Sequence, residues 1–270
     1  MDVDIPLGRK TGYPAHYSPA LLCAVPRAGS RRALGVAETL PFDGEDVWTA
    51  YDLTWLGRGE KPAVATAILR VPASSPNLIE SKSLKLYLGS LSMTRYRDVG
   101  DVASVIARDL SSVAGAAVAA TLQSLPDKAG LIPVLPGTCI DDIEVECRSW
   151  QVDTSLLHCD DRDIAEEALH SHLLRSLCPV TGQPDIGSIL IRYRGPRIDQ
   201  AGLLRYLVSY RDHGDFHEAC VERIFVDLQR YCRSTELSVY ARYNRRGGLD
   251  INPFRSNVTS SAPNLRLWRQ

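Results

Sequence analysis

Reactive side chains are densest in the segment LCPVTGQPD at 177–185. Its two prolines and its glycine exclude a regular helix, so Cys178 and Asp185 are predicted at the two ends of one stiff loop. A thiolate can attack an electrophilic carbon, and a carboxyl group beside it can manage the proton. The other interpretation is a buried loop cysteine and an aspartate that caps a turn. The spacing alone leaves both open.

A second polar pair, His217 and Glu218, opens the helix predicted at 216–231. Backbone N–H groups are unpaired in a first helical turn, and a carboxylate is electrostatically favourable there. Such a glutamate is well placed to accept paired N–H donors from a flat heterocycle. The alternative is ordinary helix-start charge, with no ligand.

Two further groups of residues with possible chemical roles carry basic or imidazole side chains. Arg242, Arg245 and Arg246 precede a glycine pair at 247–248, which favours either a phosphate site or a solvated basic turn. His170 and His172 are interpreted as surface residues that would point apart on a helix.

Composition limits the class of protein that can carry these groups. The chain has 270 residues, is 44% hydrophobic and has a formal net charge of −1, which excludes a disordered chain and a globally basic nucleic-acid binder. Seven cysteines occur without a CxxC pair or zinc-finger spacing. We therefore expect a soluble, cytoplasmic protein without disulfide bonds or metal, in which one thiol is a reagent.

The strands and helices that must position these residues are expected in the same order in both halves of the chain. The expected order is strand, helix, helix, strand, from apolar periodicities of two residues for strands and three to four for helices. In the first half these segments are 63–71, 80–91, 98–110 and 116–122. In the second half they are 187–194, 201–210, 216–231 and 236–243.

Aligning the two halves of the chain with each other reveals an internal repeat. Matched residues are 119 positions apart in the first helix and 118 positions apart in the second. The matched pairs are Glu80/Asp199, Leu84/Leu203, Tyr87/Tyr206, Leu88/Leu207, Ser90/Ser209, Ile106/Ile224, Asp109/Asp227 and Leu110/Leu228. Packing positions repeat, whereas Lys82, Lys85, His217 and Glu218 have no counterpart. This pattern predicts a duplicated unit whose copies have specialised. No GxGxxG motif follows a strand, so no Rossmann domain is expected.

The sequence resembles the QueF family of NADPH-dependent 7-cyano-7-deazaguanine reductases. The resemblance rests on ESKSLKLY at 80–87, CPVTGQPD at 178–185, HGDFHE at 213–218 and RRGGLDINP at 245–253. It extends over nearly the whole chain. The arrangement is similar to the long form of the family, in which the lysine motif lies in the first module and the nucleophile in the second.

This resemblance implies an α+β fold of two tandem tunnelling-fold (T-fold) modules, each an antiparallel sheet with a pair of helices on one face. The chain is divided accordingly into an irregular N-terminal arm at 1–45, a module with the ESKSLK motif at 46–145, and a catalytic module at 146–270. It also implies a homodimer that contacts neither nucleic acid nor a membrane.

The implied reaction reduces the nitrile of preQ0 to the primary amine of preQ1, on the route to queuosine in tRNA, with two equivalents of NADPH and no metal. Carried over by position, Cys178 forms a covalent thioimide and Asp185 donates a proton, so the two groups are expected to share a proton. The implied substrate-binding residues are Ile79, Glu80, Ser81, His217 and Glu218. The implied NADPH contacts are Ser81, Lys82, Arg246 and Gly247.

Three alternatives stand beside this hypothesis. A cysteine-dependent hydrolase of a nitrile or amidine would use the same Cys178 and Asp185, with water in place of hydride. A non-catalytic purine-binding protein of the same fold would form no covalent adduct. A zinc-dependent cyclohydrolase of the same broad fold is disfavoured, because the sequence shows no Cys/His ligand set.

Overall fold

The computed structural model describes residues 12–36, 38–123 and 132–270, so residues 1–11 of the predicted arm lie outside the described residues. The chain divides into two compact units. Unit 1 comprises the described residues of 1–29, 46–131 and 245–251, and unit 2 comprises those of 30–45, 132–244 and 252–270. Strand β10 (Leu249–Ser256) therefore begins in unit 1 and ends in unit 2.

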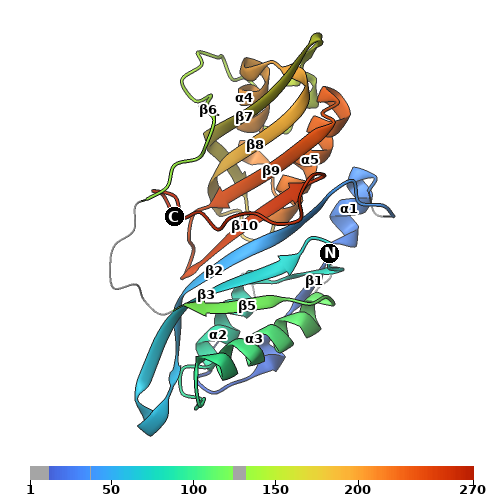
Figure 1. The fold of residues 1–270 in the computed structure, drawn as a ribbon. Coiled ribbons are helices and arrows are strands. Elements are labelled where there is room, and N and C mark those ends of the chain that lie inside the picture. The colour runs from blue at the N-terminus through green and yellow to red at the C-terminus, as the bar shows by residue number, and fades with distance from the viewer. Residues whose placement is uncertain (1–11, 37, 124–131) are drawn as a thin grey trace. The chain divides into compact units, whose positions relative to one another are not determined.

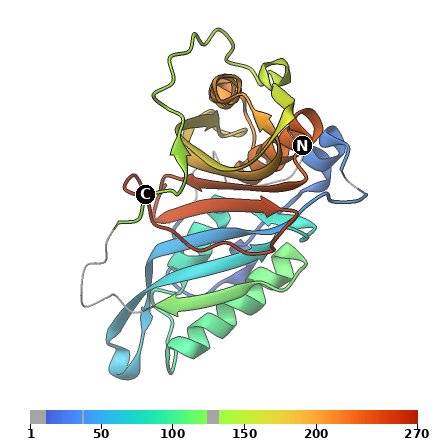
Figure 2. The ribbon, with the colours of Figure 1, turned by 45° about the horizontal axis from the view of Figure 1, so that its top comes forward.

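Unit 1 is built on the strand order β5-β3-β2, in which β3 and β5 pair antiparallel, and on a small antiparallel pair of β1 with β4. Figure 2 shows the green helix α3 running alongside these strands. Trp48, Leu84, Tyr87 and Ile106 belong to its buried apolar core. The element bounds are β1 (Ala24–Pro26), β2 (Asp43–Leu56), β3 (Pro62–Pro72), β4 (Asn77–Ile79), α2 (Ser81–Ser90), α3 (Val99–Ala114) and β5 (Ala119–Gln123).

Unit 2 contains the strand order β10-β9-β8-β7-β6, paired antiparallel except for the parallel pair of β6 with β7. Helices α4 and α5 lie on one face of these strands (Figure 1). The element bounds are α1 (Ala28–Leu34), β6 (Thr138–Cys139), β7 (Cys159–Leu177), β8 (Pro184–Ile198), α4 (Gln200–Val208), α5 (His217–Cys232) and β9 (Glu236–Tyr243).

The α+β class and the twofold element order are confirmed, but the segment that holds the two histidines is different from the prediction. Residues 159–177 form the 19-residue strand β7, and His170 is buried on it rather than exposed on a helix. The strand shifts register between Asp160 and Ile164 and between Ser171 and Leu174. Such irregularities break the alternation of apolar residues by which a strand is recognised in a sequence.

The internal repeat is confirmed by matching hydrogen bonds in the two units. The Tyr87 hydroxyl donates to Asp109 Oδ2 at 2.7 Å in unit 1, and the Tyr206 hydroxyl donates to Asp227 Oδ2 at 2.8 Å in unit 2. Both tyrosines and both aspartates are buried. Each pair ties the first helix of its unit to the second, so it stabilises the same helix packing twice.

The helix starts of the two repeats are also capped alike. Glu80 caps α2 by accepting from the Lys82 and Ser83 backbone N–H groups at 2.8 and 2.7 Å. Asp199 caps α4 by accepting from the Ala201 and Gly202 N–H groups. A carboxylate at this position satisfies otherwise unpaired N–H donors and is favoured by the helix dipole.

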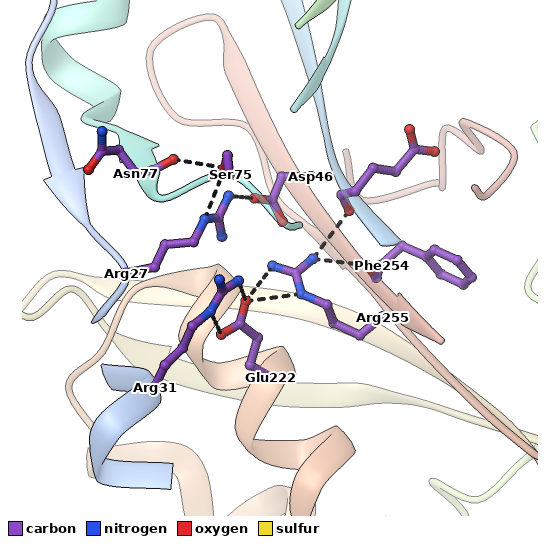
Figure 3. Close-up of polar contacts among 9 residues, drawn as sticks. Arg27, Arg31, Asp46, Ser75, Asn77, Glu222, Phe254 and Arg255 are labelled. Atoms are coloured by element: carbon purple, nitrogen blue, oxygen red, sulfur yellow. Dashed lines mark hydrogen bonds and ion pairs between the residues drawn. The ribbon is translucent and has the colours of Figure 1, made fainter. Parts of the chain in front are cut away.

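Unit 2 also buries a charge network that sequence analysis missed. Arg31 of α1 and Arg255 of β10 approach the Glu222 carboxylate of α5 from two sides (Figure 3). Arg31 Nη2 lies 2.7 Å and Arg255 Nη2 lies 2.9 Å from Glu222 Oε1. A smaller network lies in unit 1, where Arg27 donates to Asp46 and to Ser75 Oγ. These contacts connect distant segments within each unit.

Candidate active site

Cys178 lies in the connection between β7 and β8, as the loop prediction requires. Leu177 pairs with Pro184, and the Cys178 N–H donates to the Gln183 carbonyl at 2.9 Å, so the hairpin extends to the cysteine. Asp185 is the second residue of β8 and faces Ser176 across the pair. Diagonal neighbours on one face of such a pair have Cβ atoms roughly 5–8 Å apart. The hairpin therefore brings the thiol and the carboxyl group to neighbouring positions.

The imidazole of His217 joins this pair from helix α5. Its Nε2 lies 3.2 Å from Asp185 Oδ2; the Asp185 side chain is buried, and the His217 side chain is 10% exposed. The ring stacks on Tyr243 of β9 with 3.8 Å between centroids and 7° between planes, which fixes its orientation. The Nδ1 atom is buried and has no hydrogen-bond partner among the described residues. Tyr243 is the positioning residue that sequence analysis recognised only as a strand residue.

Glu218 follows at the second position of α5 and is 4% exposed. The N-cap residue, Phe216, makes no side-chain cap hydrogen bond. The first turn of α5 thus carries an imidazole and a buried carboxylate at consecutive positions. A flat ligand with adjacent N–H donors suits such a carboxylate, since charge-assisted paired hydrogen bonds are strong in a buried site.

The other buried thiols of unit 2 lie in surroundings that disfavour a thiolate. Burial raises the pKa of Cys220, and the nearby Asp215 carboxylate raises it further. Burial also raises the pKa of the Cys232 thiol to about 12. Both thiols are therefore protonated at neutral pH and are poor nucleophiles. Cys178 is 8% exposed and lies diagonally across the hairpin from Asp185 by strand register, which favours it as the reagent.

The predicted substrate contacts of the first half all lie at the β4–α2 junction of unit 1. Ile79 is 4% exposed, pairs with Ala24 across β1 and β4, and belongs to the core. The carboxylate of Glu80 is 2% exposed and caps α2, a structural role that the sequence interpretation did not foresee. Ser81 is half-buried at the first position of α2.

The predicted NADPH contacts Lys82, Arg246 and Gly247 also belong to unit 1. Arg246 and Leu249 pair across a tight turn whose central glycines, Gly247 and Gly248, have φ values of 58° and 79°. A side chain is strained at such angles, and a Cβ at Gly247 would lie 3.1 Å from Lys85 Nζ. The turn and helix α2 therefore lie close together and gather basic groups, including Lys85, which the sequence interpretation did not assign to the cofactor.

Arg242 does not belong to this basic group. It is 1% exposed in unit 2, and its guanidinium donates to Gln270 Oε1 at 3.0 Å and to Asn264 Oδ1 at 2.8 Å. The placement of Arg242 in one basic group with Arg245 and Arg246, as a phosphate site or a solvated turn, is therefore wrong. The alternation of β9 directs it inward, where these polar side chains compensate its burial.

Comparison with known proteins identifies the family. A family model described as "Nitrile reductase, 7-cyano-7-deazaguanine-reductase N-term" matches residues 13–122, and a second, "QueF-like protein", matches residues 184–262. Proteins named NADPH-dependent 7-cyano-7-deazaguanine reductase from Burkholderia orbicola and Chromohalobacter salexigens are 51% and 52% identical to the chain. The alignments cover 98% of this chain and 98% and 96% of those proteins. The chain belongs to the 7-cyano-7-deazaguanine reductase family.

Both family matches contain residues that are predicted to form the site of this reductase family member. The first match includes Ile79, Glu80, Ser81 and Lys82, and the second includes Asp185, His217 and Glu218. A relative from Burkholderia vietnamiensis with the same name is 51% identical over 268 residues, which extends the likeness across Cys178. None of the helices in the described part of the chain combines the length and apolarity needed to cross a bilayer.

Proposed function

We propose that this chain catalyses the NADPH-dependent reduction of the nitrile of preQ0 to the primary amine of preQ1. The observation that carries the proposal is the group of Cys178, Asp185 and His217 at one end of the β7–β8 hairpin. It occurs in a chain about half identical, over 98% of its length, to proteins named for this activity. The cysteine is the nucleophile, and Asp185 manages the proton.

The first step adds the Cys178 thiolate to the nitrile carbon while one proton goes to the nitrile nitrogen, which gives a thioimide. This addition breaks one carbon–nitrogen π bond and forms one carbon–sulfur bond. Asp185 donates the proton, and its contact with His217 provides a route for replacing it. Glu218 holds the heterocycle through its N–H groups. A buried site also excludes water, which would otherwise hydrolyse the thioimide.

The residues of unit 1 suit a phosphate-bearing cofactor by the chemistry of their donors. Lys82 and Lys85 on α2 and Arg246 beside the glycine turn offer cationic groups, and glycines allow close backbone approach. NADPH supplies hydride, and two equivalents account for the four electrons between a nitrile and an amine. Ile79, Glu80 and Ser81 remain proposed substrate contacts, with Glu80 acting partly by fixing the start of α2.

We further propose that each repeat is a T-fold module, predicted at 46–145 and 146–270, although the compact units assign residues 132–145 to the second and 245–251 to the first. Support comes from the paired helices and the duplicated Tyr–Asp hydrogen bonds of the two units. A cytoplasmic homodimer without a metal requirement in the reaction is part of the same proposal.

The deciding experiment follows NADPH absorbance in the presence and absence of preQ0. The proposal expects consumption only with preQ0, and two NADPH per amine formed. Release of an amide or acid without NADPH consumption would identify a hydrolase instead. Binding of preQ0 without turnover or a covalent adduct would identify a non-catalytic binder.

Replacing Glu218 with alanine is expected to weaken preQ0 binding by roughly 2–4 kcal/mol, because a paired, charge-assisted hydrogen bond is lost in a buried site. Titration calorimetry in the Cys178→Ala background measures this affinity without covalent capture. Glu218→Gln tests whether the charge matters, and Glu166→Ala, at an exposed position of β7, is the control. Unchanged affinity of the Glu218→Ala variant for preQ0 would mean that other residues bind its heterocycle.

Replacing Lys82 with alanine is expected to raise the KM for NADPH about tenfold, as for the loss of one charge-assisted phosphate contact of about 1.5 kcal/mol. Thioimide formation needs no NADPH, so adduct yield with preQ0 alone should be unchanged. Steady-state kinetics and intact-mass analysis separate the two readouts. A lower adduct yield with an unchanged KM for NADPH would place Lys82 at the substrate instead.

A further inference from the structure

A second cluster of reactive side chains lies at the β6 edge of the unit 2 sheet. Cys139 of β6 and His170 of β7 are register partners, and His172 follows two residues later on the same strand. One ligand atom from each of the three residues can be chosen so that all lie within 4.8 Å of one another. The two imidazole rings meet edge to face with centroids 5.4 Å apart. The cluster combines a thiol with two imidazoles at the spacing of a metal site.

Both histidines are held by their Nδ1 atoms. Nδ1 of His170 lies 3.1 Å from the Pro136 carbonyl oxygen, and Nδ1 of His172 lies 2.8 Å from Ser188 Oγ. An imidazole that donates its Nδ1–H to an oxygen presents an unprotonated Nε2, which is the form that binds metals.

Asp141 supplies a carboxylate next to the same residues. Its Oδ2 accepts from the backbone N–H of His172 at 2.9 Å, and its Oδ1 is buried without a hydrogen-bond partner among the described residues. A buried carboxylate oxygen without a partner is costly unless a donor or a cation compensates it. Burial raises the pKa of the Cys139 thiol and the Asp141 carboxylate adds to this rise, although a hydrogen bond with the Asp141 backbone acts in the opposite direction.

We propose that Cys139, His170 and His172 bind Zn²⁺, with a water molecule as the fourth ligand and the Asp141 carboxylate nearby. Zinc prefers thiolate and imidazole ligands in tetrahedral geometry, at about 2.3 Å to sulfur and about 2.0–2.1 Å to nitrogen. These bond lengths require ligand atoms somewhat closer than the 4.8 Å limit, so the exposed Cys139 rotates inward on binding. Binding releases the thiol proton to solvent as the sulfur–zinc bond forms.

This site is separate from the candidate active site on the same strand. His172 precedes Leu177, the last residue of β7, by five residues, which corresponds to roughly 16 Å along an extended strand. The zinc ion would connect the two-residue strand β6 to β7, where few backbone hydrogen bonds hold it. Its role is therefore structural: it fastens the segment 136–141 to the edge of the sheet.

The experiment uses the full chain, stripped of metal by a chelator and titrated with Co²⁺ as a spectroscopic substitute for Zn²⁺. The proposal expects one equivalent to produce a thiolate-to-cobalt charge-transfer band and the strong visible bands of tetrahedral cobalt. Adding Zn²⁺ should abolish both bands and raise the melting temperature. Cys139→Ser should remove the charge-transfer band, and His172→Gln should weaken binding at least about tenfold.

Matched variants exclude other thiols as the source of the signal. Cys147→Ser and Cys159→Ser change partly exposed cysteines outside the cluster and should keep the full spectrum. Cys178→Ala should also keep it, which separates this proposal from the proposed function. Absence of a charge-transfer band in the unsubstituted protein, or its persistence in Cys139→Ser, would overturn the zinc site.

Discussion

Cys178→Ala is expected to abolish the covalent adduct with preQ0 and to lower turnover by at least about 10⁴-fold, since the reaction has no other route through a thioimide. The other buried thiols of unit 2 cannot substitute for it. Burial raises the pKa of Cys220 and Cys232, so both remain protonated at neutral pH. Intact-mass analysis after mixing with preQ0 measures the adduct, and NADPH absorbance measures turnover.

Cys232→Ala is the matched control, because it removes a buried thiol of the same unit at the end of α5. It should keep both the adduct and most of the activity. If Cys178→Ala kept measurable turnover with two NADPH consumed per amine, covalent capture by this sulfur would be ruled out, while the family membership would be unaffected.

Glu222→Ala is expected to destabilise the protein by about 3–5 kcal/mol, the usual cost of breaking a buried ion pair by removing one partner. The variant leaves the guanidinium groups of Arg31 and Arg255 without their shared carboxylate, at 6% and 0% exposure. The expected loss of stability exceeds that of a cavity alone, because both guanidinium charges stay buried after their shared carboxylate is removed. The midpoint of urea unfolding, followed by circular dichroism, measures the change.

A control for this prediction is Glu236→Ala, which removes an exposed partner of Arg194 in the same unit. Exposed pairs contribute about 0–1 kcal/mol, so this midpoint should barely move. Equal shifts in the two variants would show that the Glu222 network contributes no more than a surface pair. Replacing Glu222, Arg31 and Arg255 together by apolar residues should recover stability, because no unpaired charge then remains.

Sequence patterns predicted the parts of the fold in which local rules and packing agree. The stripe of Leu84, Tyr87 and Leu88 marked helix α2, and the repeat offset paired Tyr87 with Tyr206 before any hydrogen bond was visible. The repeat is visible in the sequence because each buried hydroxyl needs a hydrogen-bond partner, which places a tyrosine and an aspartate at matching positions of both halves. The loop of Cys178 was predictable for a different reason, since its prolines and glycine exclude regular structure.

Other features depended on contacts between segments that are distant in sequence. Cys139 and His170 are 31 positions apart and match no known zinc spacing, so only the β6–β7 register brings them together. The stacking of Tyr243 on His217 likewise depends on how β9 meets α5. Glu80 was assigned to the substrate because its motif is distinctive, although the capping bonds it makes are local.

The return of residues 245–251 to unit 1 has a consequence for synthesis on the ribosome. Translation delivers a chain from its amino end, and domains commonly fold in that order as they emerge. Here the half that is made first lacks the Arg246–Leu249 turn until nearly the whole polypeptide has been translated. Most of unit 2, residues 132–244, is made before that turn. Unit 1 therefore completes its fold only after most of unit 2 has been synthesised, and a product terminated before residue 245 lacks a part of each unit.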